Sequence, residues 1–271
     1  MIASPASADV YTLGEGPVWD PVRQRLLWVD IVAGAVHEGR LDGERIDVTG
    51  SHRFDSTVGA VAVSAEGELI VAERITLTRV GLDGSRTTLA QVRTRGRLND
   101  GAVDPAGRFL IGSLGQVGQE VLARLDETGI TYLDTDLTLS NGLAWIDGRL
   151  YSVDTGSGIV WVRDYDTGLR REAFRITEGL PDGMCADADG TLWIANWGLG
   201  RVERRTTSGD LLALVETGAP HTTSACFAGP DLDILVITTA TQELSEPGPL
   251  DGRLFTARVG VRGLPAPYWR S

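Results

Sequence analysis

The stretch that decides the fold is LPDGMCADADGTLWIA, residues 180–195. It starts with a short run headed by a small residue, turns at residues 188–190 and continues as an apolar strand. The same plan occurs in five other places, and the equivalent small residues, called anchors here, are Gly16, Gly59, Gly101, Gly142, Gly183 and Ser224. Consecutive anchors lie 41 to 43 residues apart, a period typical of β-propeller blades. The sequence therefore predicts an all-β, six-bladed β-propeller.

A propeller of this kind closes its ring by combining strands from both ends of the chain. The last unit, from Ser224 onward, has room for about three strands and a Pro- and Gly-rich loop at residues 242–252. Residues 8–13 look like a strand that precedes the first anchor. We predict that this N-terminal strand is the outer strand of the last blade, because closure removes an exposed sheet edge.

Composition supports one domain over residues 1–271 and limits the partners. The chain has 34 glycines, which suits many short strands and turns. Its 37 acidic and 25 basic residues give a net charge of −12, which argues against nucleic acid and anionic membrane surfaces but is compatible with a bound cation. No basic start with an apolar run and no apolar segment of transmembrane length is visible, so we expect a cytoplasmic protein. The oligomeric state stays open.

Two cysteines, Cys185 and Cys226, each follow their anchor by two residues. The equivalent position elsewhere holds small apolar residues such as Val18 and Ala144. We therefore interpret both cysteines as small core residues. A disulfide between neighbouring blades is the alternative, although two cysteines do not make a secreted disulfide scaffold.

The residue before each anchor forms the candidate site, because equivalent positions in a propeller converge on the central axis. These six residues are Glu15, Val58, Asp100, Asn141, Asp182 and Thr223. Oxygen ligands suit Ca²⁺, Mg²⁺ or Mn²⁺, and Zn²⁺ accepts carboxylates too. Asn-Gly and Asp-Gly are also common hairpin turns, so each pair alone fits a turn. However, the hairpin turn of the repeat lies elsewhere, and polar residues in one phase favour a site.

Two further residues precede Asp100 on the same segment. Arg97 and Asn99 alternate to one side of an extended chain and can donate hydrogen bonds to a polar ligand; a surface loop is the alternative. Asp30 and Asp154 end second strands beside the site, where we expect structural or supporting roles. Trp197 lies at the same end, where it would either wall a pocket or belong to the core.

Four motifs occur in order along the chain: EGP at residues 15–17, RLNDG at 97–101, SNGL at 140–143 and PDGMC at 181–185. This set resembles the family of regucalcin (senescence marker protein), gluconolactonase and luciferin-regenerating enzyme, over residues 14–268. The resemblance implies a six-bladed propeller with one divalent metal ion, metal ligands at Glu15, Asn141 and Asp182, and substrate contacts at Arg97 and Asn99. One segment departs from the acidic pattern of some members, because residues 114–118 read LGQVG and Glu120 comes only later.

The resemblance and the ring together predict a metal-dependent lactonase that hydrolyses a small sugar (aldono) lactone to the aldonic acid. The cofactor would be one divalent ion, with Ca²⁺ first and Zn²⁺, Mn²⁺ or Mg²⁺ as alternatives. Asp182 would be both a metal ligand and the general base, or would orient the water. The alternatives are a hydrolase of another lactone or ester on the same site, and a non-catalytic metal-binding propeller.

Overall fold

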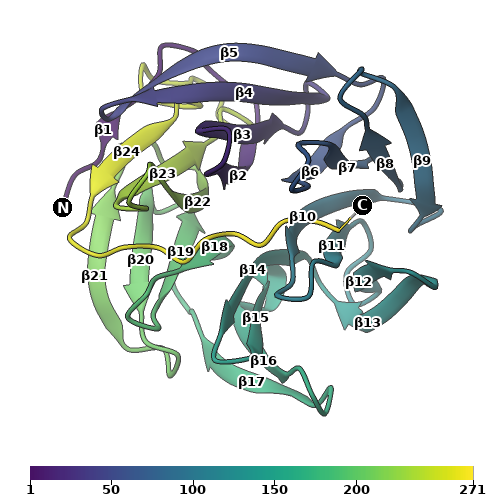
Figure 1. The fold of residues 1–271 in the computed structure, drawn as a ribbon. Coiled ribbons are helices and arrows are strands. Elements are labelled where there is room, and N and C mark those ends of the chain that lie inside the picture. The colour runs from purple at the N-terminus through teal and green to yellow at the C-terminus, as the bar shows by residue number, and fades with distance from the viewer. Residues whose placement is uncertain (271) are drawn as a thin grey trace.

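The structure, a computed structural model, describes residues 1–270 and consists of six four-stranded sheets around a central axis (Figure 1). The predicted all-β, six-bladed propeller is therefore confirmed. Besides strands, the described part contains a single turn of 3₁₀-helix, η1 (Thr155–Ser157). Within residues 1–270, no helix has the length and apolar character needed to span a membrane.

In blades 1 to 5 the four strands follow the chain from an inner strand at the axis to an outer strand at the rim, whereas the outer strand of blade 6 comes from the N-terminus. Blades 1 and 2 are β2 (Gly14–Asp20), β3 (Arg25–Asp30), β4 (Ala35–Asp42) and β5 (Arg45–Arg53), then β6 (Val58–Val63), β7 (Leu69–Glu73), β8 (Thr76–Val80) and β9 (Arg86–Gln91). Blades 3 and 4 are β10 (Arg97–Val103), β11 (Phe109–Leu114), β12 (Glu120–Asp126) and β13 (Gly129–Leu137), then β14 (Ser140–Ile146), β15 (Arg149–Asp154), β16 (Ile159–Asp164) and β17 (Arg170–Arg175). Blades 5 and 6 are β18 (Leu180–Ala186), β19 (Leu192–Trp197), β20 (Arg201–Arg205) and β21 (Leu211–Glu216), then β22 (Thr222–Ala228), β23 (Ile234–Thr239), β24 (Phe255–Arg258) and β1 (Ser4–Pro5).

An N-terminal strand closes the ring, as predicted, but its predicted position at residues 8–13 is wrong. The closing strand is β1, whose Ser4 and Pro5 pair with Thr256 and Phe255 of β24. Residues 8–13 instead connect β1 to the first inner strand. Tyr11 in this connection is buried, and its N–H donates to the Gly252 carbonyl oxygen at 2.7 Å. A largely exposed connector in which only Tyr11 and Leu13 are buried thus carries the pattern that predicted a strand.

The core lies between blades. Six clusters of buried apolar residues occur among the described residues, and each includes side chains of two neighbouring blades. The second strand of each blade supplies much of this packing; Trp28 and Trp193 are at most 1% exposed. Burial of this apolar surface on both faces of every sheet explains why the second strands are continuous apolar runs.

The two faces of the propeller differ. Inner strands begin on the face that we call the mouth and end on the face that we call the tail face. Residues 259–270 run across the tail face, over the middle of the ring (Figure 1). Their backbone bonds reach several blades: Ala188 N donates to Arg262 O at 2.8 Å, Trp269 N donates to Val63 O at 2.9 Å, and Arg270 N donates to Gly107 O at 2.8 Å.

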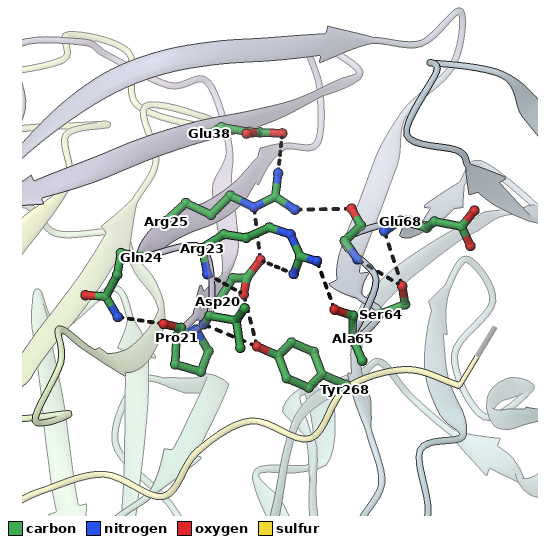
Figure 2. Close-up of polar contacts among 12 residues, drawn as sticks. Asp20, Pro21, Arg23, Gln24, Arg25, Glu38, Ser64, Ala65, Glu68 and Tyr268 are labelled. Carbon is green, nitrogen blue, oxygen red and sulfur yellow. Dashed lines mark hydrogen bonds and ion pairs between the residues drawn. The ribbon is translucent and has the colours of Figure 1, made fainter.

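A polar network on the tail face ties blades 1 and 2 to this tail (Figure 2). Asp20 is fully buried and accepts hydrogen bonds from the Tyr268 hydroxyl at 3.0 Å and from Arg25 Nε at 3.1 Å. Arg23 and Arg25 also reach the next blade, since Arg23 Nη2 donates to the Ala65 carbonyl oxygen at 2.8 Å. The tail therefore fastens several blades from one side.

Between the tail and the mouth lies a cavity of about 370 Å³, lined by inner strands of all six blades. Its walls are mainly apolar, residues 264–267 of the tail form its floor, and Asp100 is the carboxylate among its lining residues. The channel is thus apolar below the ring of predicted site residues.

Candidate active site

The ring residues sit where every inner strand is irregular. Pairing of β14 with β15 jumps from Ser140 to Leu143, and pairing of β18 with β19 jumps from Pro181 to Met184. In both blades two residues on the inner strand oppose one on its partner, which is a β-bulge. A bulge redirects a side chain out of the regular alternation. This explains why Asn141 and Asp182 belong to the ring although their strands continue past them.

Three of the glycine anchors, Gly59, Gly142 and Gly183, are required by close contact between neighbouring inner strands. A Cβ atom on Gly142 would lie 2.5 Å from the Asp182 carbonyl oxygen, and one on Gly183 would lie 2.2 Å from Ser224 Oγ. Neither position can therefore hold a side chain without moving the next blade. The small residues recur about every 41 residues in the sequence because neighbouring inner strands pack closely around the axis.

Glu15, Asn141 and Asp182 are 5%, 5% and 7% exposed. Burial raises the pKa of Glu15 well above its usual range, and the charges of Asp182 and Asp100 raise it further. Burial and the charge of Asp100 raise the pKa of Asp182 in the same way. Burial alone raises the pKa of Asp100 to about 6. The structure therefore gathers three buried carboxylates within electrostatic reach of one another.

The amide of Asn141 is held in one orientation. Its Nδ2 donates to Thr155 Oγ1 at 3.1 Å, and that hydroxyl donates to the Pro181 carbonyl oxygen at 2.8 Å. The Asn141 Oδ1 atom is buried and accepts no hydrogen bond from a described residue. A buried acceptor without a donor is costly, so this atom fits a ligand that supplies positive charge.

This set fits a hard divalent cation, which prefers carboxylate and amide oxygens. In the described part of the chain, no group of three or more His, Cys, Asp and Glu side chains could hold a metal ion by itself. The predicted set is different, because Asn141 supplies one of its three oxygens. Asp100 therefore contributes to the charge of the ring without completing an all-carboxylate site.

Arg97 lies within electrostatic reach of the ring, because its charge acts to lower the pKa values of Glu15 and Asp182. Burial lowers its pKa, and the charges of Glu15 and Asp182 act in the opposite direction. Arg97 Nη1 donates to Asn99 Oδ1 at 2.6 Å, and Asn99 Nδ2 donates to the Ser140 carbonyl oxygen at 3.0 Å. Asn99 thus links Arg97 to the strand that carries Asn141.

Other predicted residues at this end have structural roles. Asp30 accepts hydrogen bonds from Thr12 N at 2.9 Å and Leu13 N at 3.2 Å, just before the first inner strand. Asp154 does the same in blade 4, where it accepts from Thr138 N at 2.9 Å. Both side chains therefore shape the loops that lead into the ring.

Glu120, which follows the segment that departs from the family pattern, is also structural. It is fully buried, and its carboxylate accepts hydrogen bonds from Gln116 N and Ser113 Oγ. It holds the loop between β11 and β12 in place.

An aromatic pair at the mouth was not predicted. Trp197, at the end of β19, stacks on His221 with ring centroids 3.9 Å apart and an interplanar angle of 13°. Trp197 pairs with Leu180, two residues before Asp182, and packs against the cluster that contains Leu13, two residues before Glu15. The pair therefore lies beside the segments that carry two ring carboxylates. No sequence spacing links His221 to Trp197, because their contact depends on the pairing of two blades.

The fold and the buried oxygen atoms at one end of the channel define a six-bladed β-propeller with a candidate cation site on its axis. The chain belongs to the SMP-30/gluconolactonase/LRE-like family, whose model matches residues 13–241. It is 33% identical to regucalcin of Xenopus laevis, over 95% of this chain and 94% of that protein, and 35% identical to the pentonolactonase XacC of Haloferax volcanii, over 93% of each. It also superposes on a solved calcium-binding protein, regucalcin of Agrobacterium tumefaciens, with a TM-score of 0.91 and 26% identity, covering 100% of this chain and 99% of the other.

Proposed function

We propose that this protein is a lactonase that hydrolyses a small sugar (aldono) lactone to the aldonic acid and requires one divalent metal ion. The observation that carries the proposal is the buried Oδ1 of Asn141, which accepts no hydrogen bond from the described residues and belongs to the same ring as two carboxylates with raised pKa values. The similarity to a named pentonolactonase supports the substrate class.

Glu15, Asn141 and Asp182 would hold the ion through oxygen atoms, a donor set that suits Ca²⁺ and also admits Mg²⁺, Mn²⁺ or Zn²⁺. When bound, such an ion supplies Lewis acidity at a carbonyl group and cancels negative charge in the ring. The buried setting of these residues limits competing water, which strengthens each electrostatic interaction.

The residues of the ring suggest how the reaction would proceed. Asp182 would take a proton from the attacking water, whose oxygen bonds to the lactone carbonyl carbon. The ring C–O bond would then break and the departing oxygen would take up the proton held by Asp182, which gives the hydroxy acid and restores the Asp182 carboxylate. Arg97 would stabilise the developing negative charge on the carbonyl oxygen, and Asn99 would keep Arg97 in position through their 2.6 Å hydrogen bond.

A lactone panel with a pH indicator tests this function directly. Protein treated with chelator is assayed before and after addition of Ca²⁺, alongside Asp182→Asn and the control Glu246→Gln, an exposed acid on the loop before β24. We expect calcium-dependent opening of an aldonolactone, a loss of about 10²–10⁴-fold in Asp182→Asn, and unchanged activity in the control. No turnover of any lactone with or without metal would refute the proposal.

Calcium binding without catalysis is the second candidate, because the solved regucalcin is named a calcium-binding protein. Isothermal titration with Ca²⁺ separates the two. Tight binding that Asp182→Asn abolishes, together with no activity on the lactone panel, would favour this candidate.

A further inference from the structure

Three backbone carbonyl groups beside the proposed metal ligands accept hydrogen bonds in the same way. Each belongs to the residue directly before a ligand, and each accepts from a buried side chain of the preceding blade around the ring. The pairs are Asn99 Nδ2 and Ser140 O at 3.0 Å, Thr155 Oγ1 and Pro181 O at 2.8 Å, and Thr223 Oγ1 and Gly14 O at 2.6 Å. The ligands that follow these carbonyls are Asn141, Asp182 and Glu15.

This pattern is confined to the three blades that carry a proposed ligand. The other blades hold Val58, Asp100 and Thr223 at the ring position. Within residues 1–270, no side chain of another blade donates to the carbonyl before any of these three; the Thr57 oxygen accepts a side-chain bond from the adjacent Ser56, at 3.3 Å. The distribution of the bonds therefore follows the proposed ligand set and not the repeat alone.

A hydrogen bond to this carbonyl restrains the ligand residue itself. The peptide unit is planar, so the oxygen of one residue and the Cα atom of the next move together. The ladder of backbone pairs is also irregular here, because pairing jumps after Glu15 in blade 1, after Ser140 in blade 4 and after Pro181 in blade 5. A bulge disrupts the local ladder. The side-chain bond from the neighbouring blade therefore supplies a restraint where the regular pairing is interrupted.

Thr155 also determines which atom of Asn141 is left without a partner. A threonine hydroxyl has one proton to donate. Thr155 donates that proton to the Pro181 oxygen, so its Oγ1 can only accept from Asn141, at 3.1 Å. The amide of Asn141 must then turn its NH₂ group toward Thr155. This leaves Oδ1 as the buried atom that accepts no hydrogen bond from a described residue.

Thr223 has an equivalent arrangement where the last blade meets the first. Its Oγ1 atom lies 2.8 Å from Thr238 Oγ1, and because its own proton goes to the Gly14 oxygen, it accepts from Thr238. Both threonines are fully buried. Water cannot readily replace a donor lost from this position, so removal of the hydroxyl group would leave the Gly14 carbonyl free to move.

We propose that Thr155 and Thr223 are positioning residues that fix Asp182 and Glu15 across two blade boundaries and thereby pre-organise the ring for one divalent ion. The inference rests on the proposed metal site but not on the lactone chemistry. Asn99 makes the third bond, but it also contacts Arg97, so its replacement would disturb both contacts at once.

Calorimetric titration of chelator-treated protein with Ca²⁺ measures the effect. Thr155→Val and Thr223→Val keep the shape of the side chain and remove its hydroxyl group. Each should raise the Kd for Ca²⁺ about 10–100-fold, the usual cost of losing an outer partner of a metal ligand. Thr155→Ser and Thr223→Ser keep the hydroxyl group and should bind Ca²⁺ nearly as tightly as the wild type. Circular dichroism verifies that all four variants fold.

Thr256→Val is the matched control. Thr256 is 1% exposed, and its hydroxyl donates to the Glu44 carbonyl oxygen of blade 1 at 2.7 Å. This bond also crosses a blade boundary, but Thr256 lies on the third strand of its blade and not at the axis. Thr256→Val should unfold at lower urea concentration in chelator, because a buried hydrogen bond is lost, and should keep the wild-type Kd for Ca²⁺.

A raised Kd in both valine variants, recovery in the serine variants and an unchanged Kd in Thr256→Val would support the inference. An unchanged Kd in either valine variant, no recovery in the serine variants, or an equal rise in Thr256→Val would overturn it. Failure of the metal-dependent function would be seen in the wild type instead. Wild-type protein that binds none of Ca²⁺, Mg²⁺, Mn²⁺ and Zn²⁺ would refute that function and this inference together.

Discussion

Replacement of Asp100 by asparagine should stabilise the protein when metal is removed. The pKa of Asp100 rises from an ordinary value of 3.8 to about 6 because the side chain is buried without a cationic partner. A raised pKa in the folded state means that the fold binds the proton more tightly than the unfolded chain does. The contribution to stability is therefore fully present below pH 3.8 and is lost as the pH rises to about 6.

The rise in the pKa of Asp100 from 3.8 to about 6 corresponds to a loss of about 3 kcal/mol in the free energy of unfolding at pH 8. Asp100→Asn removes the ionised carboxylate and keeps its shape, so the variant should unfold at higher urea concentration than the wild type in chelator at pH 8. Near pH 4 the two proteins should unfold alike. With saturating Ca²⁺ the variant should gain less stability than the wild type, because a carboxylate of the ring is missing.

Urea unfolding followed by tryptophan fluorescence measures these differences, and Asp104→Asn is the matched control. Asp104 is buried four residues further on, but it is paired: Arg108 Nε donates to it at 2.7 Å and the Tyr165 hydroxyl at 2.9 Å. Asp104→Asn should therefore lose stability with and without metal. If Asp100→Asn were destabilised in chelator at pH 8 as Asp104→Asn is, the inferred cost of burying the ionised Asp100 carboxylate would be wrong.

Three further changes test other parts of the structure. Arg97→Ala and Asn99→Ala should keep the metal, measured by elemental analysis, yet slow lactone opening by about 10²–10³-fold; unchanged kcat and KM would make this segment a mere loop. Trp269→Ala should lower the free energy of unfolding by about 3–5 kcal/mol because this side chain is buried between blades 2 and 3, whereas Tyr268→Phe should cost only about 0.5–1.5 kcal/mol, and equal losses would contradict the packing. Trp197→Leu should raise KM for the lactone more than it lowers kcat, and an unchanged KM would remove Trp197 from the binding surface.

The blades could be predicted from the sequence because contact between neighbouring inner strands excludes a side chain at three of the six anchors, Gly59, Gly142 and Gly183. For this reason glycine recurs at a regular spacing in the sequence, as at Gly142 and Gly183. The closing strand could not be located in the same way. Only Ser4 and Pro5 pair with β24, and two residues carry no periodicity. The connector at residues 8–13 buries only Tyr11 and Leu13 and looks like a strand without being one.

The identity of the ring residues was visible, but the way in which they are held was not. The bulge that redirects Asn141 depends on pairing with β15, and its amide is oriented by Thr155 in the turn η1. Neither interaction has a fixed spacing in the sequence. The stack of Trp197 on His221 likewise joins two blades. Local pattern therefore predicts which residues meet at the axis, whereas tertiary packing decides which atoms remain without a partner.

The charge of the ring also bears on the kind of ion that it would accept. Glu15, Asp100 and Asp182 carry three negative charges when ionised, and Arg97 carries one positive charge, which leaves a net charge of about −2 in a buried site. A divalent ion would make this site neutral, whereas a monovalent ion would leave one uncompensated charge. Ca²⁺ added to chelator-treated protein should therefore raise the unfolding midpoint, and KCl at equal ionic strength should not. Equal recovery in KCl would show that salt screening, rather than an ion bound at the ring, relieves the repulsion.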